Sequence, residues 1–211
     1  MTLRLHHAPM ACSLASRLAL AESGLPHEVA IVRTWLGEQK TDAYRRINPR
    51  GKVPALETDR GVITESTAIL PFIADLAPDK ALLPPAGTFE RAQAQAWLSF
   101  LSSTLHASLS AAMFPVEGCE EIARDAALSR VVGAFSDLDG HLDGRDHLLD
   151  AFSLCDLYML VFLLWRAAPA LSGRLPSFPN LDRLQQALLA RPGVMAIVAD
   201  EMKLRSQAAT A

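Results

Sequence analysis

The sequence has few cysteines, no long apolar run and little net charge. Its three cysteines, Cys12, Cys119 and Cys155, lie far apart and form neither a CxxC pair nor a zinc-type spacing, which predicts free thiols and no metal site. The longest fully apolar run, residues 157–165, is much shorter than the roughly 20 residues that cross a bilayer. Polar residues also interrupt every apolar stretch before residue 24, so no secretion signal is indicated and we predict a cytosolic protein.

The charge balance excludes another class of partner. Lys and Arg together number 20 against 23 Asp and Glu, a formal net charge of -3. Such a chain has no long-range attraction for phosphate backbones or anionic lipid, so we expect no nucleic-acid or membrane partner. Its length of 211 residues suffices for two small domains.

What the sequence does contain is a change of pattern near its middle. Alternating and helical patterns in residues 1–76 predict the order β-α-β, a polar connector over 34–50, then β-β-α. Residues 77–88 are rich in Pro and predict a linker. From residue 89 to 211 the patterns are helical, with strand signals nearly absent. We predict an α/β domain over 1–76 and an all-α domain over 89–211.

Within the helical half, Ser153 and Asp156 open the most apolar helix of the chain. Ser followed three residues later by an acidic residue is the pattern of a capping box, with Asp in place of the usual Glu or Gln. A buried helix start needs such caps because water cannot satisfy its N–H groups. We therefore interpret Asp156 as structural rather than catalytic.

Cys12 lies where the first strand gives way to the first helix. A thiol at a helix N-terminus is expected to have a lowered pKa, because the peptide dipoles and free N–H donors stabilise the thiolate. This position predicts a reactive cysteine, although free cysteines are also common as small buried side chains. There is no cysteine at position 15, so a dithiol redox cycle at this place is excluded.

Two further places carry local signals. A cis Val53-Pro54 bond would turn the backbone N–H and C=O of Val53 toward a cleft, whereas a trans bond would be an ordinary strand start. Glu65 and Ser66 stand at a strand-to-helix junction, where helix N–H groups attract a carboxylate and Glu65 can pair with an ammonium. Ser66 taken singly is an N-cap candidate for a helix over 67–76.

These pieces occur in an order and spacing that resembles the cytosolic glutathione transferases, and in particular their bacterial beta class. The matching stretches are ACSL at 11–14, NPRGKVPAL at 48–56, TES at 64–66, IADLAP at 73–78, LLPP at 82–85, and Ser153 with Asp156. The match runs along almost the whole chain. It favours the cis form of the Val53-Pro54 bond.

The resemblance implies a thioredoxin-like domain that binds glutathione and a helical domain that supplies a pocket for an apolar electrophile. By the same likeness, the backbone of Val53 before Pro54 pairs with the cysteinyl part of glutathione, and Glu65 and Ser66 hold its γ-glutamyl end. Cys12 takes the beta-class cysteine position near the glutathione sulfur. A homodimer is implied as well.

Three other residues enter through this resemblance. His106 matches a histidine on the first helix of the second domain that lines the glutathione cleft, where an imidazole could donate a hydrogen bond to sulfur or exchange a proton. Ser13 is a rival to Cys12, because other transferase classes use a serine hydroxyl in this loop; its simpler role is helix capping. Lys52 is a candidate contact for a glutathione carboxylate.

The sequence also departs from the beta-class pattern. His7 stands in place of a usual tyrosine and Met10 in place of a common glycine, while Trp35 and Ala107 stand where lysines are often found. We predict an enzyme that conjugates the glutathione thiolate to small apolar electrophiles, in the manner of detoxification enzymes. The alternatives are glutathione-dependent thiol-disulfide exchange with Cys12 as nucleophile, and a non-catalytic binding module of the same fold.

Overall fold

The computed structural model describes residues 2–208, and its chain divides into two compact units. The first contains the residues up to Ala86 together with those from Ala190 onward, and the second contains Gly87–Leu189. The division thus falls inside the segment predicted as a linker.

A four-stranded sheet forms the centre of the first unit, with strand order β2-β1-β3-β4. Its strands are β1 (Leu3–His7), β2 (His27–Ile31), β3 (Ala55–Thr58) and β4 (Gly61–Thr64). β1 pairs parallel to β2 and antiparallel to β3, and β3 pairs antiparallel to β4. The predicted hairpin and all four strands are present, because alternating apolar residues such as Leu3 and Leu5 are buried while Arg4 is exposed.

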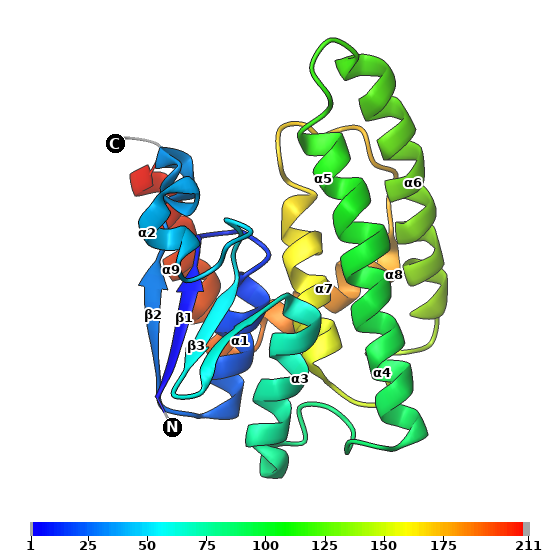
Figure 1. Cartoon of the computed structure of the whole chain (residues 1–211). Helices are drawn as coiled ribbons and strands as arrows, with labels where there is room; N and C mark the ends of the chain where they lie inside the picture. Colours follow the sequence, from blue (N-terminus) through cyan, green and yellow to red (C-terminus); the bar gives the residue numbers. More distant parts are fainter. Residues whose placement is uncertain (1, 209–211) are drawn as a thin grey trace. The chain divides into compact units, whose positions relative to one another are not determined.

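Helices α1 (Leu14–Ser23) and α3 (Ser66–Leu76) pack against each other beside this sheet (Figure 1). α1 ends at Gly24 in a left-handed conformation, as a glycine at this position permits. The connector over 34–50 was predicted as a loop and contains three short helical turns instead: η1 (Thr34–Leu36), η2 (Glu38–Lys40) and α2 (Asp42–Arg45). Such short turns bury too little to leave a periodic pattern in the sequence.

The last helix, α9 (Pro192–Ala208), corrects the predicted domain boundary. The prediction placed residues 89–211 in one helical domain, but α9 belongs to the first unit, and residues 209–211 lie outside the described part of the chain. α9 packs on α1, where Arg191 donates to Glu22 at 2.7 Å and Glu201 reaches the interior. These contacts join residues far apart in sequence, so helical periodicity alone could not assign α9 to either unit.

The secondary-structure elements described in the second unit are helices, as predicted. They are α4 (Phe89–Phe100), the π-helical segment η4 (Leu101–His106), α5 (Ala107–Met113), α6 (Glu120–His141), α7 (Leu154–Trp165) and α8 (Pro179–Leu189). α5 and α6 lie side by side (Figure 1). α7 is the core helix, with every residue from Leu154 to Leu163 buried. Within residues 2–208, no helix is long and apolar enough to cross a membrane.

The predicted capping box at the start of α7 is confirmed. The Ser153 hydroxyl accepts from the Cys155 N–H at 3.2 Å, and the Ser153 N–H donates to Asp156 Oδ2 at 2.8 Å. The other oxygen of Asp156 accepts from the Leu148 N–H at 2.9 Å. Burial raises the pKa of Asp156 more than these hydrogen bonds lower it. Asp156 is therefore a structural acceptor that holds the preceding loop to the helix.

Candidate functional site

The Val53-Pro54 peptide bond is cis, as the resemblance predicted. The loop before it is fixed by two donors to one carbonyl: the Tyr44 hydroxyl at 2.8 Å and the Asn48 amide at 2.7 Å both bind the Lys52 oxygen. Tyr44 and Asn48 are buried, so these bonds are sheltered from water. Neither residue was predicted for the site, although Asn48 lies in the NPRGKVPAL stretch.

The Cys12 thiol lies beside this bond. Its Sγ is 3.4 Å from the Val53 carbonyl oxygen and donates a hydrogen bond to it, which requires a protonated sulfur. Two residues predicted for the site are thus in direct contact, although one follows β1 and the other precedes β3. This contact between a thiol and the main chain beside a cis proline bond is the central geometric feature of the first unit.

The expected lowering of the Cys12 pKa is wrong. The pKa of Cys12 is raised to about 11, chiefly by burial and to a smaller extent by the Glu65 carboxylate. Hydrogen bonds from the N–H groups of Cys12 and Ser13 and the charge of Lys52 lower it, but less than burial raises it. By surface exposure Cys12 is only half-buried, but the protein around its sulfur displaces water, and this desolvation disfavours a thiolate. The sequence could not show this loss of water. Only about one part in ten thousand of a thiol with this pKa is ionised at pH 7.

The Ser13 side chain is directed into the interior of the first unit. Its hydroxyl is fully buried, accepts from the Ala8 N–H at 3.1 Å and lies 2.8 Å from His7 Nδ1. Among the described residues it also caps no N–H group of α1, so its predicted capping role is wrong too. The side chain faces the interior because Ser13 already has helical backbone angles. Ser13 shapes the loop in this way, and its predicted role at the glutathione sulfur stays a prediction.

Helix α3 begins one residue earlier than the sequence suggested. Glu65 is the N-cap of α3 and has a left-handed φ of 70°, while Ser66 is the first helical residue and is buried. Within the described chain no side chain caps α3, so the predicted capping role of Ser66 is wrong. The Glu65 carboxylate is largely exposed and lies 4.0 Å from Arg50, which also donates to Thr64. Glu65 and Arg50 thus place charged side chains beside the start of α3, where no side chain of the described residues caps the helix.

His106 belongs to the second unit, at the end of the π-helical segment η4. Its ring lies 5.5 Å from that of Phe162 and 5.2 Å from that of Trp165, both on α7. π-Helical segments are rare and frequently occur at functional sites. An aromatic wall around a half-buried imidazole suits proton exchange in a site with little water, but the role predicted for His106 stays a prediction.

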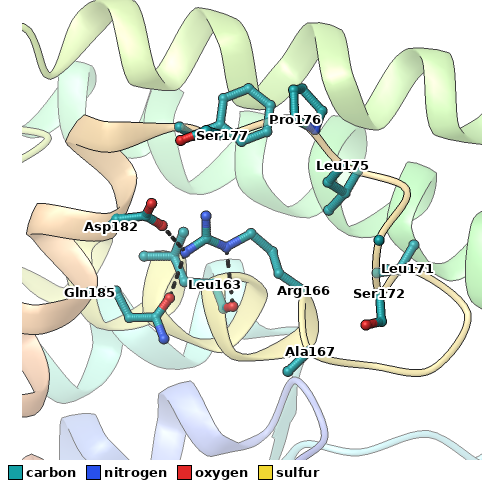
Figure 2. Close-up of a pocket in the computed structure, with 12 residues that line it drawn as sticks. Leu163, Arg166, Ala167, Leu171, Ser172, Leu175, Pro176, Ser177, Asp182 and Gln185 are labelled. Atoms are coloured by element: carbon teal, nitrogen blue, oxygen red, sulfur yellow. Dashed lines mark hydrogen bonds and ion pairs between the residues drawn. The ribbon is translucent and has the colours of Figure 1, made fainter.

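The second unit also has a cavity of its own, of about 360 Å³, between the end of α7 and the start of α8. Figure 2 shows Arg166 extending across its floor toward Asp182 and Gln185. Arg166 binds Asp182 at 2.8 Å and Gln185 at 2.6 Å, so its charge is neutralised within the protein. The remaining wall is mostly apolar, with residues such as Leu163 and Leu175. An anionic ligand would find no unpaired positive charge there.

Across residues 2–208, no group of three or more His, Cys, Asp or Glu side chains is arranged to hold a metal ion. The polar chemistry of the first unit instead gathers around Cys12, the Val53 main chain and the Glu65 junction.

Comparison with known proteins identifies the family. The model of the glutathione S-transferase N-terminal domain matches residues 9–76. A glutathione S-transferase of Xanthomonas campestris pv. campestris is 32% identical over 94% of this chain and 98% of its own length. The chain belongs to the glutathione S-transferase family. Its predicted identity as a glutathione transferase is thereby confirmed.

Solved structures support the same assignment. A bacterial beta-class glutathione S-transferase from Sphingomonas chungbukensis is 36% identical over 94% of this chain and 98% of that one, with a TM-score of 0.82. A sphingomonad glutathione S-transferase solved in complex with glutathione is 37% identical over the same shares, with a TM-score of 0.83. The predicted thioredoxin-like domain followed by a helical domain, and the likeness to the beta class, are confirmed.

Proposed function

We propose that this glutathione transferase conjugates the glutathione thiolate to small apolar electrophiles. The observation that carries the proposal is the contact between the Cys12 thiol and the Val53 carbonyl, beside the cis Val53-Pro54 bond. Main-chain N–H and C=O groups at such a place can pair with the backbone of a bound peptide. Glutathione is the peptide that the family membership and the glutathione complex of a similar protein suggest.

In this proposal the reacting sulfur belongs to glutathione and not to the protein. Cys12 is protonated at neutral pH, and its single S–H hydrogen, which is donated to the Val53 carbonyl in the free protein, would turn to the glutathione sulfur on binding and favour the thiolate. The thiolate then forms a bond to the electrophilic carbon, and the leaving group departs with the bonding electrons. The proton lost by glutathione passes to water, or to His106 as a second candidate. Positioning and thiolate stabilisation are the means of catalysis.

The Glu65 junction would hold the other end of glutathione. An exposed carboxylate beside the open N-terminus of α3 offers one partner for an ammonium and several N–H donors for a carboxylate. These are the two charged groups of a γ-glutamyl residue. Ser66, as the first residue of α3, contributes its N–H and hydroxyl, and the exposed Lys52 is a candidate partner for a further carboxylate of glutathione.

Comparing two substrates separates this proposal from thiol-disulfide exchange. The purified chain should turn over a chloronitroaromatic with glutathione faster than it reduces a small mixed disulfide. The high pKa of Cys12 favours this order, because a thiol that is seldom ionised is a poor nucleophile. Faster reduction of the disulfide, lost in Cys12→Ala, would establish exchange as the function.

The glutathione site itself is tested by a matched pair of variants. Glu65 and Glu28 are exposed glutamates, with side chains 63% and 69% exposed, that each lie about 4 Å from an arginine. Glu65→Gln should raise the KM for glutathione about tenfold, the size of one charged hydrogen bond, and Glu28→Gln should leave it unchanged. Millimolar glutathione should also raise the melting temperature of the native chain. No protection and no turnover would favour the non-catalytic binding module.

The remaining expectations concern assembly and location. Family likeness suggests a homodimer, which sedimentation would test directly. The cytosolic location stays a prediction from the sequence.

A further inference from the structure

Met10, two residues before Cys12, has a left-handed backbone conformation with a φ of 58°. A side chain with a Cβ atom disfavours this conformation, because the Cβ approaches the neighbouring carbonyl oxygen. Glycine would adopt it freely, but the chain has a methionine here. Some other interaction must hold the Met10 backbone in place.

Glu201, on α9, supplies that interaction. Its Oε2 accepts from the Met10 N–H at 2.6 Å, while its Oε1 lies 2.6 Å from His7 Nε2 and also accepts from Arg17. Glu201 and His7 are completely buried. A hydrogen bond from a peptide N–H to a buried carboxylate is among the stronger ones in proteins. Burial alone would raise the pKa of Glu201, but the bonds from His7, Met10 and Arg17 lower it overall, which keeps this acceptor ionised.

The turn that follows transmits this constraint to Cys12. The Ala11 N–H donates to the Ala8 carbonyl at 3.1 Å, and the Leu14 N–H donates to the Ala11 carbonyl at 3.0 Å. The backbone between Ala8 and Leu14 is therefore tightly folded. A change of φ at Met10 would rotate the following peptides and carry the Cys12 sulfur away from the Val53 carbonyl.

We propose that Glu201 is a positioning residue for the glutathione site: it holds Met10 in the left-handed conformation and thereby fixes the Cys12 thiol against Val53. This inference rests on the proposed function in one respect, the role of the Cys12 thiol toward glutathione. The positioning itself concerns the free protein and is measured without glutathione.

The test follows alkylation of Cys12 by iodoacetamide at neutral pH, with mass spectrometry of the Cys12 peptide and the exposed Cys119 as internal reference. Glu201→Gln should speed Cys12 alkylation at least about tenfold relative to Cys119, because burial is what keeps this thiol protonated. Adding Met10→Gly should restore the slow rate, since glycine adopts the left-handed conformation unaided. Adding Met10→Ala should not, because alanine keeps the Cβ.

This difference between glycine and alanine separates positioning from general loosening of the fold. Equal rates in the two double variants, or an unchanged rate in Glu201→Gln, would overturn the inference.

Should Glu201→Gln not fold, Met10→Val serves instead, because it leaves the Glu201 bonds to His7 and Arg17 intact. A β-branched residue is especially unfavourable at this φ, so Met10→Val should speed Cys12 alkylation and Met10→Gly should not; equal rates in these two would contradict the inference.

The glutathione KM of the same variants distinguishes the two proposals. A KM that rises in Glu201→Gln and returns with Met10→Gly supports both. If the alkylation pattern holds while the KM stays constant, Glu201 positions Cys12 but glutathione does not use this thiol, and the proposed function is what fails.

Discussion

Helices α7 and α1 both begin inside the protein, but their first turns are completed in different ways. At α7, Ser153 and Asp156 lie three residues apart and bind the free N–H groups themselves. At α1, none of the described side chains caps the helix, and the loop before it is held by Glu201 from the other end of the chain. The capping box thus uses two N–H groups at the start of α7 that a ligand would otherwise meet. At the start of α1, which Glu201 supports, the N–H groups of Cys12 and Ser13 are directed at the thiol sulfur.

The largest effect is expected where the cap is local. Asp156→Ala should lower the free energy of unfolding by about 3 kcal/mol, because two buried backbone N–H groups lose their acceptor. Urea denaturation measures this loss, with Asp137→Ala on the exposed face of α6 as control. A loss below about 1 kcal/mol would mean that the α7 start does not depend on its capping box.

The remote support of α1 should depend on pH. The pKa of Glu201 is lowered on folding, so its carboxylate stabilises the fold above its unfolded-state pKa of about 4.3, and this stabilisation is lost as the pH falls through the lower folded-state pKa. At pH 7, Glu201→Gln should cost about 2 kcal/mol, the value of a hydrogen bond to a charged group. His7, Arg17 and Asp200 are the charged or titratable neighbours in this network.

Unfolding curves of the native chain and Glu201→Gln, compared between pH 7 and pH 3, test this expectation. Their difference in stability should shrink on the acid side. A difference that stays constant over this range would show that the charge of Glu201 contributes nothing.

Much of this fold follows from local patterns. The strands, the long helices, the Ser153 cap and the Gly24 helix end each involve residues close together in sequence. The resemblance to a known family added the cis bond before Pro54. For the strands, helices and caps a short stretch of sequence carries the whole signal, whereas the cis bond needed the resemblance along the chain.

Features of the site that join distant residues could not be predicted in this way. Glu201 and Met10 are separated by nearly the whole chain, and no local pattern marks an acidic residue on an amphipathic helix as an interior acceptor. The pKa of Cys12 depends on burial, which is a property of the folded protein. Ser66 was misassigned because the turn before α3 uses a left-handed Glu65, a conformation that glutamate rarely adopts.

The smallest expected effect compares two serines at helix starts. Ser153→Ala should cost about 1 kcal/mol of stability, the usual value of an N-cap. Ser66→Ala removes no capping bond and should cost less than about 0.5 kcal/mol, while raising the KM for glutathione severalfold under the proposed function. Thermal unfolding gives the loss of stability of each variant, and initial rates give the KM for glutathione of each. An equal loss of stability in the two variants would remove the distinction between a capped and an open start.

The central claim is that glutathione supplies the thiolate while Cys12 stays a neutral donor beside the Val53 main chain. An ultraviolet difference titration of the protein with and without glutathione follows thiolate formation directly. We predict that bound glutathione ionises well below the pKa of an ordinary thiol, about 8.5, while Cys12 remains protonated until near pH 11. If bound glutathione titrates like the free tripeptide while the Cys12 thiol ionises near neutral pH, the roles of the two sulfurs are the reverse of those described here.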